Sequence, residues 1–523
     1  MNIDNLTKYL PADIINAPQQ ALTMFEVKKE EIANLCQGLH KDCGLPLKLI
    51  TACDNRSASG DFKIFYIFHV PEKNYFLIPY IKTTDEKFPS IVKKIHEASV
   101  FEKKIKTFFG LEPVGHPHST PIILQENWPT NIYPLRKDFA WDTKVPMANN
   151  KENFTIFKGE GIYDIPVGPV HAGIIEPGYF RFSVLGEEIL MFQAQLGYVH
   201  KGSEKLFETL SLGDKLKLSE KISGDSTFSH SLAFCQAVEN LANLEISEQT
   251  GYLRVVFSEL ERLANHFGDI GAMMLDTGFN FGGAQGARLR ESIMQINERL
   301  TGSRYLRGAN DFGGINFNIN KDNLTKLTDE LLNIKNDFES VIEIAEKSSS
   351  LLNRLKKTGI LSKRKAVDHG IVGVAARACG IKVDARIDTP YAAYDKLEFK
   401  IQTEQDCDVY SRFQVRIKEV RVSFELLNES LNILSKLEVD NYKQTSELKL
   451  KPSSYAIGIT EGWRGEIIYF VSTDKDGQIC RVDVRDPSLL NWTVTPYAVK
   501  SNVVPDFPLI NKSFNLSYSG NDV

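Results

Sequence analysis

The chain has 523 residues, a mass of 59.0 kDa and a formal net charge of −5, with 42% hydrophobic and 25% charged residues. This composition is typical of a globular protein of two or three domains, and it excludes a disordered or fibrous chain. The mild negative charge gives no electrostatic reason to expect a nucleic acid partner, and no apolar run reaches the ~20 residues of a membrane-spanning helix. The N-terminus has neither a basic start nor an apolar core, so we expect no signal peptide.

Residues 20–142 are expected to form a small α+β domain. Two β-rich runs, at 62–68 and 75–81, are separated by turn-forming residues at 71–74. A helix is predicted over 91–109, because the glycine that follows is a common C-terminal stop. The chain shows no internal repeat and no low-complexity tract.

A polar linker is predicted over 143–157, followed by a second domain over 158–523. The second domain begins with a strand at 179–184 and a turn at 185–188. The fold class that follows is α+β, with a small N-terminal α+β domain before a large, mainly helical domain with a β fringe. The other elements predicted there are helices around 253–267, 324–357 and 417–431 and strands at 466–472 and 479–484.

The cysteines limit the possible chemistry. No two of them have C-x-x-C spacing, so zinc ribbons, thioredoxin-like redox pairs and ordinary iron–sulfur ligation are unsupported. An odd number in a chain without a signal peptide also argues against a disulfide framework. We interpret all seven as buried or half-buried thiols: Cys36, Cys43, Cys53, Cys235, Cys379, Cys407 and Cys480.

Three local motifs have ordinary structural explanations. The glycine-rich run 282–286 lacks the G-x-x-x-x-G-K-[ST] pattern of a phosphate loop, and nothing in the chain supports direct NADH binding. His171, in a glycine-flanked loop, is on spacing alone more often a hydrogen-bonded loop residue than a ligand. Asp225, between Ser223 and Ser226, is likewise more often a turn or capping residue.

A series of short motifs nevertheless runs through the chain in a fixed order. Their number and order, rather than any one of them, carry the argument, because each alone is weak. They are found at 108–117, 128–129, 133–139, 168–182, 197–205, 261–272, 384–386, 390–395, 408–412, 461–466 and 485–488. In this respect the chain resembles the 30-kDa and 49-kDa subunits of complex I and of the energy-converting (group 4) NiFe hydrogenases, fused as in the large subunit of formate hydrogenlyase.

This resemblance implies a nickel site that the chain has lost. In the hydrogenases two C-x-x-C pairs hold the metal; here the early pair falls on Ser223 and Ser226 and the late pair on Ser517 and Gly520. Soft thiolates hold nickel and iron, whereas a neutral hydroxyl is a poor substitute and glycine offers no ligand. We therefore expect no metal on this chain and no hydrogen activation. By the same resemblance, we expect no tail after Val523 of the kind that hydrogenase maturation removes.

The resemblance to complex I implies an acceptor site in the same place. His171 matches the first histidine of the quinone loop, whereas the second histidine falls near 176–177 and is not retained. We expect a cavity between this loop, the turn with Ser223 and Ser226, and the segment with Ser517. A quinone or another small acceptor would be reduced there, with His171 and Asp225 as candidates for proton delivery and hydrogen bonding.

The partners follow from the resemblance as well. They are a small iron–sulfur subunit of the complex I 20-kDa type, antiporter-like and other membrane subunits, and no nucleic acid. The chain would sit peripherally on the cytoplasmic side of the inner membrane. The alternative is a non-redox subunit of the same complex, in which the fold survives as a block that couples its partners.

Overall fold

A four-stranded sheet forms the N-terminal part of the computed structural model, which describes residues 3–10, 22–71, 75–150, 154–317, 319–437 and 448–523. The strand order is β1-β4-β3-β2, with β1 parallel to β4 and the other pairs antiparallel. The two predicted β-rich runs are confirmed as β3 and β4; most of the turn predicted between them lies outside the described residues. The strands are β1 (Leu22–Glu26), β2 (Leu47–Asp54), β3 (Phe62–Val70) and β4 (Tyr75–Thr83).

Helices and a small second sheet complete this domain. The predicted helix ends where expected, because Gly110 adopts φ 71°, but α4 (Ala98–Phe109) begins later than residue 91. Residues 91–97 form turns and not the first turns of the helix. The amide of Ile91 donates to a side-chain oxygen of Glu102 at 2.7 Å. The remaining elements are η1 (Ile3–Lys8), α2 (Ile32–Gln37), η2 (Gly38–Asp42), α3 (Arg56–Ser59) and the parallel pair β5 (Lys87–Pro89) and β6 (Glu112–Val114).

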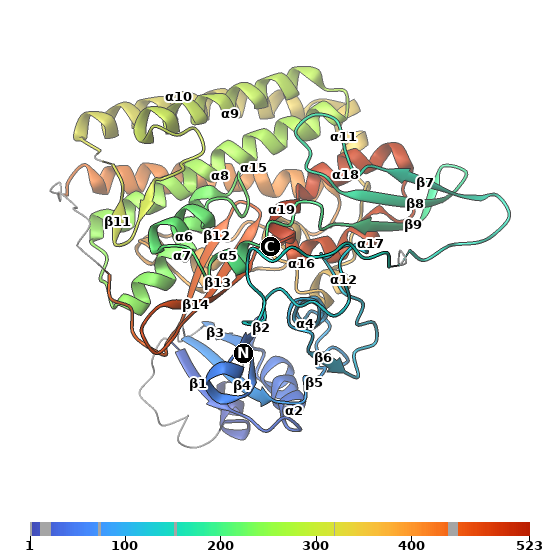
Figure 1. Ribbon diagram of the computed structural model, residues 1–523. Helices are drawn as coiled ribbons and strands as arrows, with labels where there is room; N and C mark the ends of the chain where they lie inside the picture. The colour runs from blue at the N-terminus through green and yellow to red at the C-terminus, as the bar shows by residue number, and fades with distance from the viewer. Residues whose placement is uncertain (1–2, 11–21, 72–74, 151–153, 318, 438–447) are drawn as a thin grey trace.

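Long helices dominate the rest of the chain (Figure 1). The longest, α8, has 29 residues, and its first turn is capped by Ser247, whose hydroxyl accepts the Thr250 amide at 3.2 Å. The predicted helix over 324–357 is two helices, since Ser348 caps a new one directly after the first. The set is α7 (Thr227–Ala242), α8 (Glu248–Asp276), α9 (Asn280–Thr301), α10 (Lys321–Glu346), α11 (Ser349–Leu355) and α15 (Val409–Leu434).

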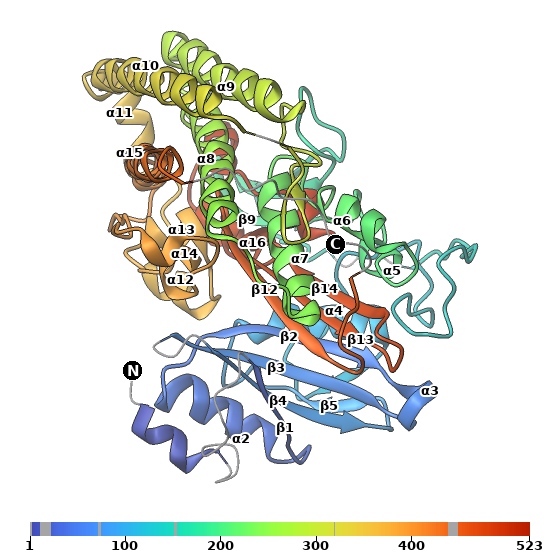
Figure 2. The same ribbon diagram turned by 90° about the vertical axis from the view of Figure 1, so that its left-hand side faces the viewer.

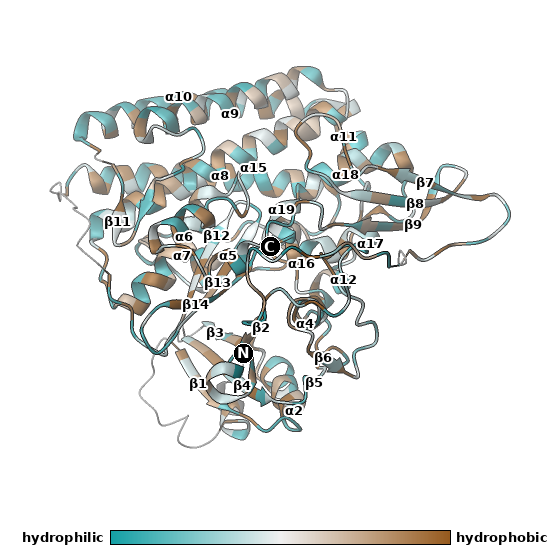
Figure 3. Cartoon of the chain, in the orientation of Figure 1, coloured by the Kyte–Doolittle hydropathy of each residue, from teal (hydrophilic) through white to brown (hydrophobic). Residues whose placement is uncertain are grey.

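The glycine-rich run belongs to a helix and not to a phosphate loop. It lies in α9 and packs on α8, where a Cβ added to Gly286 would come within 2.5 Å of the Gly271 Cα. Small residues therefore let the two backbones approach closely. Figure 3 shows both hydrophilic and hydrophobic residues along α9 and α10, as expected of helices with one face on the core. Within the described residues, no helix is both long and apolar enough to cross a membrane.

Two further sheets form the β fringe. The predicted strands at 179–184, 466–472 and 479–484 are confirmed as β8, β13 and β14, and both sheets are antiparallel. β12, whose turn into β13 carries an arginine of the site described below, was not predicted. The sheets are β7 (Ile162–Val167), β8 (Tyr179–Leu185) and β9 (Glu188–Gln195), and β12 (Tyr455–Gly462), β13 (Gly465–Thr473) and β14 (Ile479–Arg485).

The two domains share a core. The β12–β14 sheet lies against β2 and β3 of the N-terminal sheet (Figure 2), and Phe470 packs on Phe65 with ring centroids 5.4 Å apart. The short elements that follow or connect these sheets are α5 (Ser203–Leu206), α6 (Leu212–Ser219), β10 (Asn310–Asp311), β11 (Gly314–Ile315), α12 (Lys363–Asp368), α13 (Gly373–Arg377), α14 (Ala385–Asp388), η4 (Tyr394–Lys396), α16 (Pro487–Asn491), η5 (Trp492–Val494), α17 (Thr495–Val499), η6 (Val504–Asp506), α18 (Phe507–Phe514) and α19 (Tyr518–Asn521).

The α+β class with a small N-terminal domain and a large helical domain is thus confirmed. The domain limits at 20, 142 and 158 stay predictions, and residues 151–153 of the predicted linker lie outside the described part of the chain.

Candidate functional site

Asp225 stands at the centre of a polar cluster in the turn before α7. Its carboxylate accepts hydrogen bonds from the hydroxyls of Ser223 at 3.0 Å and Ser226 at 3.3 Å. It also forms a bidentate ion pair with Arg464, with N–O distances of 2.5 and 2.6 Å. Such fork-to-carboxylate pairs are both strong and geometrically specific. The cluster therefore holds a fixed salt bridge at its centre.

Arg464 reaches the cluster from the turn between β12 and β13. Its guanidinium lies over the Trp463 ring, 3.9 Å from the centroid, and its Nε donates to the Asn515 carbonyl. The Asp225 side chain is 33% exposed whereas that of Arg464 is 5% exposed. The arginine thus fills the interior side of the site, and the carboxylate borders the surface.

The late motif closes the cluster from a third segment. The Ser517 and Ser223 hydroxyl oxygens lie 2.9 Å apart, so Ser517 can donate to Ser223 while Ser223 donates to Asp225, and the Ser517 hydroxyl accepts the Gly520 amide at 2.9 Å as the cap of α19. A Cβ added to Gly520 would lie 2.5 Å from the carboxyl carbon of Asp486. The four positions that the sequence singled out are therefore brought together, and a side chain at the fourth would displace Asp486.

His171 takes no part in this cluster. Its Nε2 donates to the Gly178 carbonyl at 2.7 Å, and its ring stacks on Phe180 at a centroid distance of 5.4 Å. Among the described residues, no hydrogen bond joins His171 to Asp225. The loop instead reaches the site through Glu176, whose carboxylate accepts the amides of Tyr518 and Ser519 at 3.0 and 3.1 Å. Sequence reasoning placed the missing histidine near Glu176 but did not assign this carboxylate a role.

The charges of the central pair are fixed at neutral pH. Burial alone would raise the pKa of Asp225, but the Arg464 guanidinium and the two serine hydroxyls outweigh it and lower the pKa below its usual value. Burial likewise works against the charge on Arg464, yet Asp225 raises the pKa of the arginine. The carboxylate is therefore ionised at neutral pH and can accept a proton, but it holds none to donate.

Glu261 is a second carboxyl beside the cluster that sequence reasoning missed. It accepts the amides of Phe228 and Ser229 at the start of α7, at 2.6 and 3.1 Å. Burial, together with the nearby charge of Asp225, raises the pKa of Glu261 to about 7. A pocket of about 20 Å³ touches Asp225 and Glu261, which is room for about one water molecule.

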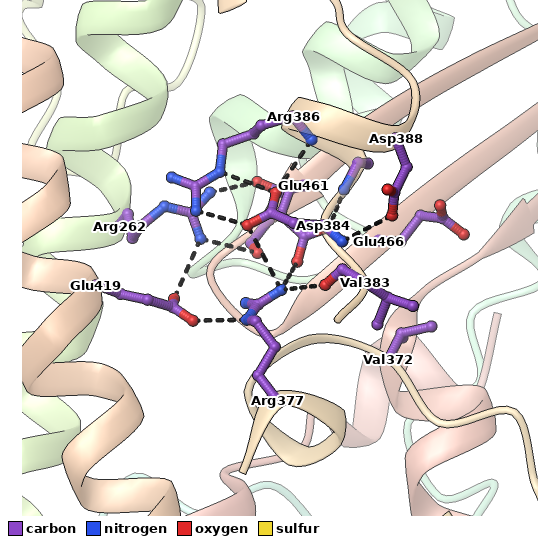
Figure 4. Close-up of polar contacts among 12 residues, drawn as sticks. Arg262, Val372, Arg377, Val383, Asp384, Arg386, Asp388, Glu419, Glu461 and Glu466 are labelled. Atoms are coloured by element: carbon purple, nitrogen blue, oxygen red, sulfur yellow. Dashed lines mark hydrogen bonds and ion pairs between the residues drawn. The ribbon is translucent and has the colours of Figure 1, made fainter. Parts of the chain in front are cut away.

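A buried ionic network supports the turn that carries Arg464 (Figure 4). Arg262 on α8 donates to the carbonyls of Glu461 and Gly462 at 2.6 and 3.2 Å. The Glu461 carboxylate accepts from Arg377 at 2.7 Å, and Arg377 also binds Glu419 on α15 at 2.7 Å. Helices α8, α13 and α15 therefore position the turn, and a shift in any of them would move Arg464.

The residues do not fit a nickel–iron centre. Three of the four ligand positions inferred from the resemblance carry hydroxyls and the fourth is glycine, whereas nickel and iron are held by thiolates. The Arg464 Nη1 lies 3.3 Å from the hydroxyls of both Ser223 and Ser226, so a cation already occupies the space between them. Within the described residues, no three His, Cys, Asp or Glu side chains are grouped to hold a metal ion.

A larger cavity lies away from this cluster. Its volume is about 860 Å³, and its walls come from the segment 120–133, from β9 and from the residues around Trp492. The Trp492 ring nitrogen donates to the Ser517 carbonyl at 3.3 Å, so this wall backs onto the late motif. The pocket of about 20 Å³ beside Asp225 is lined by α8, α9 and residues 304–306 and by none from the His171 loop or the late motif, so the acceptor cavity expected between the three site segments stays a prediction.

Comparison with known proteins matches two parts of the chain to two families. Residues 25–145 match the family described as the 30-kDa subunit of respiratory-chain NADH dehydrogenase, and residues 276–522 match the 49-kDa subunit. Hydrogenase-4 component G of Escherichia coli is 31% identical over 91% of this chain and 83% of its own length. Formate hydrogenlyase subunit 5 of the same organism is 29% identical over 95% of this chain and 88% of its own length.

Two further similarities extend the comparison. The C/D subunit of NADH-quinone oxidoreductase from Phocaeicola vulgatus is 27% identical over 86% of this chain and 88% of its own length. A chain from the structure of the membrane-bound sulfane sulfur reductase, an archaeal respiratory membrane complex, superposes with a TM-score of 0.65 at 23% identity over 70% of this chain and 99% of that one. At this identity the match concerns the fold alone.

Fold and site together define a fused protein that joins a 30-kDa-type domain to a 49-kDa-type domain. The chain belongs to the family of such fusions that includes hydrogenase-4 component G and the C/D proteins of NADH-quinone oxidoreductase, which are subunits of complex I-like and group 4 hydrogenase membrane complexes. The resemblance drawn from the motifs is therefore confirmed.

Proposed function

We propose that this chain is the subunit of a membrane-associated oxidoreductase that presents an acceptor site to a partner's iron–sulfur cluster, without activating hydrogen at a NiFe centre. The single observation that carries the proposal is the Asp225–Arg464 ion pair held among Ser223, Ser226 and Ser517. Thiolate ligands are replaced there by hydrogen-bonding groups, which suit a polar organic acceptor better than a metal.

The acceptor is a quinone or another small molecule, bound where Asp225 borders the surface. The pocket of about 20 Å³ beside Asp225 is too small for a quinone ring, so the partner completes the site over the exposed side of the carboxylate. Asp225, ionised by Arg464, orients the acceptor and relays to it a proton that the carboxylate first takes up from solvent. His171 holds its loop through the Gly178 carbonyl and is a positioning residue.

The partners we propose are a small iron–sulfur subunit of the complex I 20-kDa type and antiporter-like and other membrane subunits. The chain itself would lie peripherally on the cytoplasmic side of the inner membrane. The family match and the names of the relatives, which are subunits of larger complexes, support a place for this chain in such a complex.

Electron transfer in the purified complex tests the proposal. The complex is reduced chemically, freed of reductant and mixed with a water-soluble quinone while its metal content is measured. We expect quinone reduction without stoichiometric nickel. Nickel in stoichiometric amount would overturn the absence of a NiFe centre, and an inert complex with an intact, reduced cluster would overturn the acceptor site.

Asp225→Asn tests the carboxylate in the same assay. Loss of a proton-transferring group lowers turnover by about a hundredfold and alters its pH profile. Asp329→Asn, on the exposed face of α10, is the matched control and should keep full turnover. Full turnover of Asp225→Asn would remove the proposed role of this residue.

The alternative is a non-redox protein that couples its partners within the complex. The small pocket at Asp225 favours it, because the salt bridge already satisfies the polar groups of the cluster. Under this alternative, Asp225→Asn and Arg464→Lys would weaken assembly of the complex, measured by size-exclusion chromatography, while quinone reduction per assembled complex stayed unchanged.

A further inference from the structure

Asp225 and Glu261 line the same small pocket from two segments of the chain. The pocket has a volume of about 20 Å³, which is room for about one water molecule. The side-chain amide of Asn265 ties the two segments together, because its Nδ2 donates to the backbone carbonyls of both Asp225 and Glu261 at 2.9 Å. The pocket thus joins the carboxylate of the proposed acceptor site to a second carboxyl group.

Asn297 presents an acceptor without a donor at this pocket. It lies on α9, lines the pocket and is 2% exposed. Its Nδ2 donates to the Arg304 carbonyl at 3.3 Å, whereas its Oδ1 has no hydrogen-bond partner within the described residues. Buried polar atoms that protein groups leave unsatisfied are usually hydrogen bonded to ordered water. The Asn297 Oδ1 therefore indicates a water site in the pocket.

Asp225 offers that water a second acceptor. Its Oδ1 accepts hydrogen bonds from three side chains, those of Ser223, Ser226 and Arg464. Within the described residues, its Oδ2 accepts only from the Arg464 Nη2, at 2.6 Å. A carboxylate oxygen has two lone pairs, so Oδ2 can accept one more hydrogen bond.

Glu261 differs from Asp225 in having no cation bound to it. Its carboxyl oxygens accept only from the Phe228 and Ser229 amides and from the Ser229 hydroxyl, and its side chain is 5% exposed. Burial is the largest influence that raises the pKa of Glu261 to about 7, and the charge of Asp225 adds to it. Glu261 can therefore both hold and release a proton near neutral pH.

The charges around Glu261 come from three other segments. The charged side chains that line the pocket with it are Asp225 in the turn before α7, Arg290 on α9 and Arg304 in the loop after α9. Asp225 is paired with Arg464, and Arg304 is paired with Glu291. The side chain of Arg304 is 36% exposed and Tyr305 is 41% exposed, so the pocket borders solvent on this side.

We propose that Glu261 loads Asp225 with protons through a water molecule bound in this pocket. The Glu261 carboxyl gives its proton to the water, and the water passes one of its own protons to the Asp225 Oδ2, which delivers it to the reduced acceptor. Glu261 then takes up a proton from solvent beside Arg304 and Tyr305. Each step breaks one O–H bond and forms another, so one proton moves and no electron does.

This inference rests on the proposed function. There the partner and the acceptor cover the exposed side of Asp225, so the carboxylate needs an internal route to the protons of the solvent. Glu261 acts through Asp225 and does not touch the acceptor.

The pH profile of quinone reduction by the purified complex tests the relay. In the wild-type complex we expect turnover to fall above about pH 7, where Glu261 loses its proton. Glu261→Gln has no proton to deliver. Its turnover at about pH 6 should be about tenfold lower than that of the wild-type complex, and it should not fall further above about pH 7.

Ala264→Val tests the water and leaves both carboxyl groups in place. Ala264 on α8 lines the pocket and is 6% exposed, so the added methyl groups displace the water. We expect the same loss of turnover and the same flat profile as in Glu261→Gln. Ala272→Val, on the same helix but outside the lining of the pocket, is the matched control and should keep the wild-type profile.

The two proposals fail in different ways. A wild-type profile in both Glu261→Gln and Ala264→Val would overturn the relay and leave the acceptor site standing. An inert wild-type complex with an intact, reduced cluster would overturn the acceptor site and, with it, the relay.

Infrared spectroscopy of the full chain detects the proton without any turnover. At about pH 6 we expect a protonated-carboxyl band that shifts in heavy water and is missing from Glu261→Gln. In Ala264→Val the band should change frequency, because the Glu261 carboxyl loses its hydrogen bond to the water. If Glu261→Gln kept the full wild-type band, Glu261 would be ionised and the relay would be overturned, even if turnover fell because the variant folded poorly.

Discussion

At the scale of single residues, the protonation state of each carboxyl group in the site depends on whether a cation binds it. Asp225 keeps its charge because Arg464 and two hydroxyls bind it, whereas Glu261, which receives only neutral donors, has a pKa raised to about 7. The pKa of Asp225 is lowered in the folded state, so its contribution to stability is present above the unfolded pKa and is lost as the pH falls through the folded one.

Removing the arginine should therefore be costly. Arg464→Ala leaves Asp225 without its cation. It also removes the donor that links the β12–β13 turn to the turn before α7 and to Asn515. We expect a loss of about 2 kcal/mol in the free energy of unfolding, because the partial exposure of Asp225 limits the cost. Urea denaturation measures this. Arg288→Ala, which breaks a surface pair with Asp337, is the control and should cost less than about 1 kcal/mol. Equal effects would contradict a special role for Arg464.

Glu102 gives a pH dependence of the opposite sign. Burial raises its pKa from 4.5 to about 7, so between these values the folded protein binds more protons than the unfolded chain and stability falls as the pH rises. Glu102→Gln removes this term. As the pH rises from about 5 to about 8, we expect the free energy of unfolding of the variant to increase by about 2 kcal/mol relative to that of the wild-type protein. Urea titrations at each pH measure this difference.

Glu187→Gln, in the exposed turn between β8 and β9, controls for the loss of a carboxylate elsewhere. If the wild-type protein and Glu102→Gln kept parallel pH dependences, Glu102 would not be the group that titrates.

At the scale of elements, close backbone packing sets the geometry of the helical domain. Helices α8 and α9 meet at Gly271 and Gly286, and α8 carries Arg262, which holds the Arg464 turn. The position of the site residues thus depends on the contact between α8 and α9. A side chain larger than a hydrogen atom at either glycine would push the two helices apart.

Gly286→Ala tests this contact. Its Cβ would lie 2.5 Å from the Gly271 Cα, and backbone cannot move aside cheaply, so we expect a loss of about 2–3 kcal/mol in the free energy of unfolding. Gly213→Ala is the matched control, since a Cβ there meets nothing within 4 Å and alanine favours a helix. A stable Gly286→Ala protein would contradict the close approach of the helices.

At the scale of the whole molecule, the domains are joined by buried ion pairs as well as by the shared apolar core. Lys104 on α4 binds Glu204 at 2.5 Å and Asp483 on β14 at 3.0 Å, and Arg481 binds the same two carboxylates. All four side chains are buried, so removing one cation leaves an uncompensated carboxylate inside the interface.

Lys104→Met should accordingly weaken the contact between the domains. We expect it to lower the free energy of unfolding by about 3 kcal/mol. We also expect two separate unfolding transitions, measured by fluorescence and circular dichroism. Lys106→Met on the same helix is the control, because its pair with Glu112 is half-exposed and worth about 1 kcal/mol or less. A single transition at the wild-type midpoint would show that the ion cluster does not couple the domains.

The sequence by itself determined the fold class, the long helices and the family, because hydrophobic spacing and ordered motifs are local properties of the chain. It also located Ser223, Asp225, Ser226 and Ser517. It could not show that Arg464 fills the space between them, because that pairing joins residues 239 positions apart. The buried state of Glu261 was equally hidden, since burial and partners are set by packing between distant segments. Tertiary structure therefore decided how the residues of the candidate site are paired and charged, because those properties depend on contacts between distant segments.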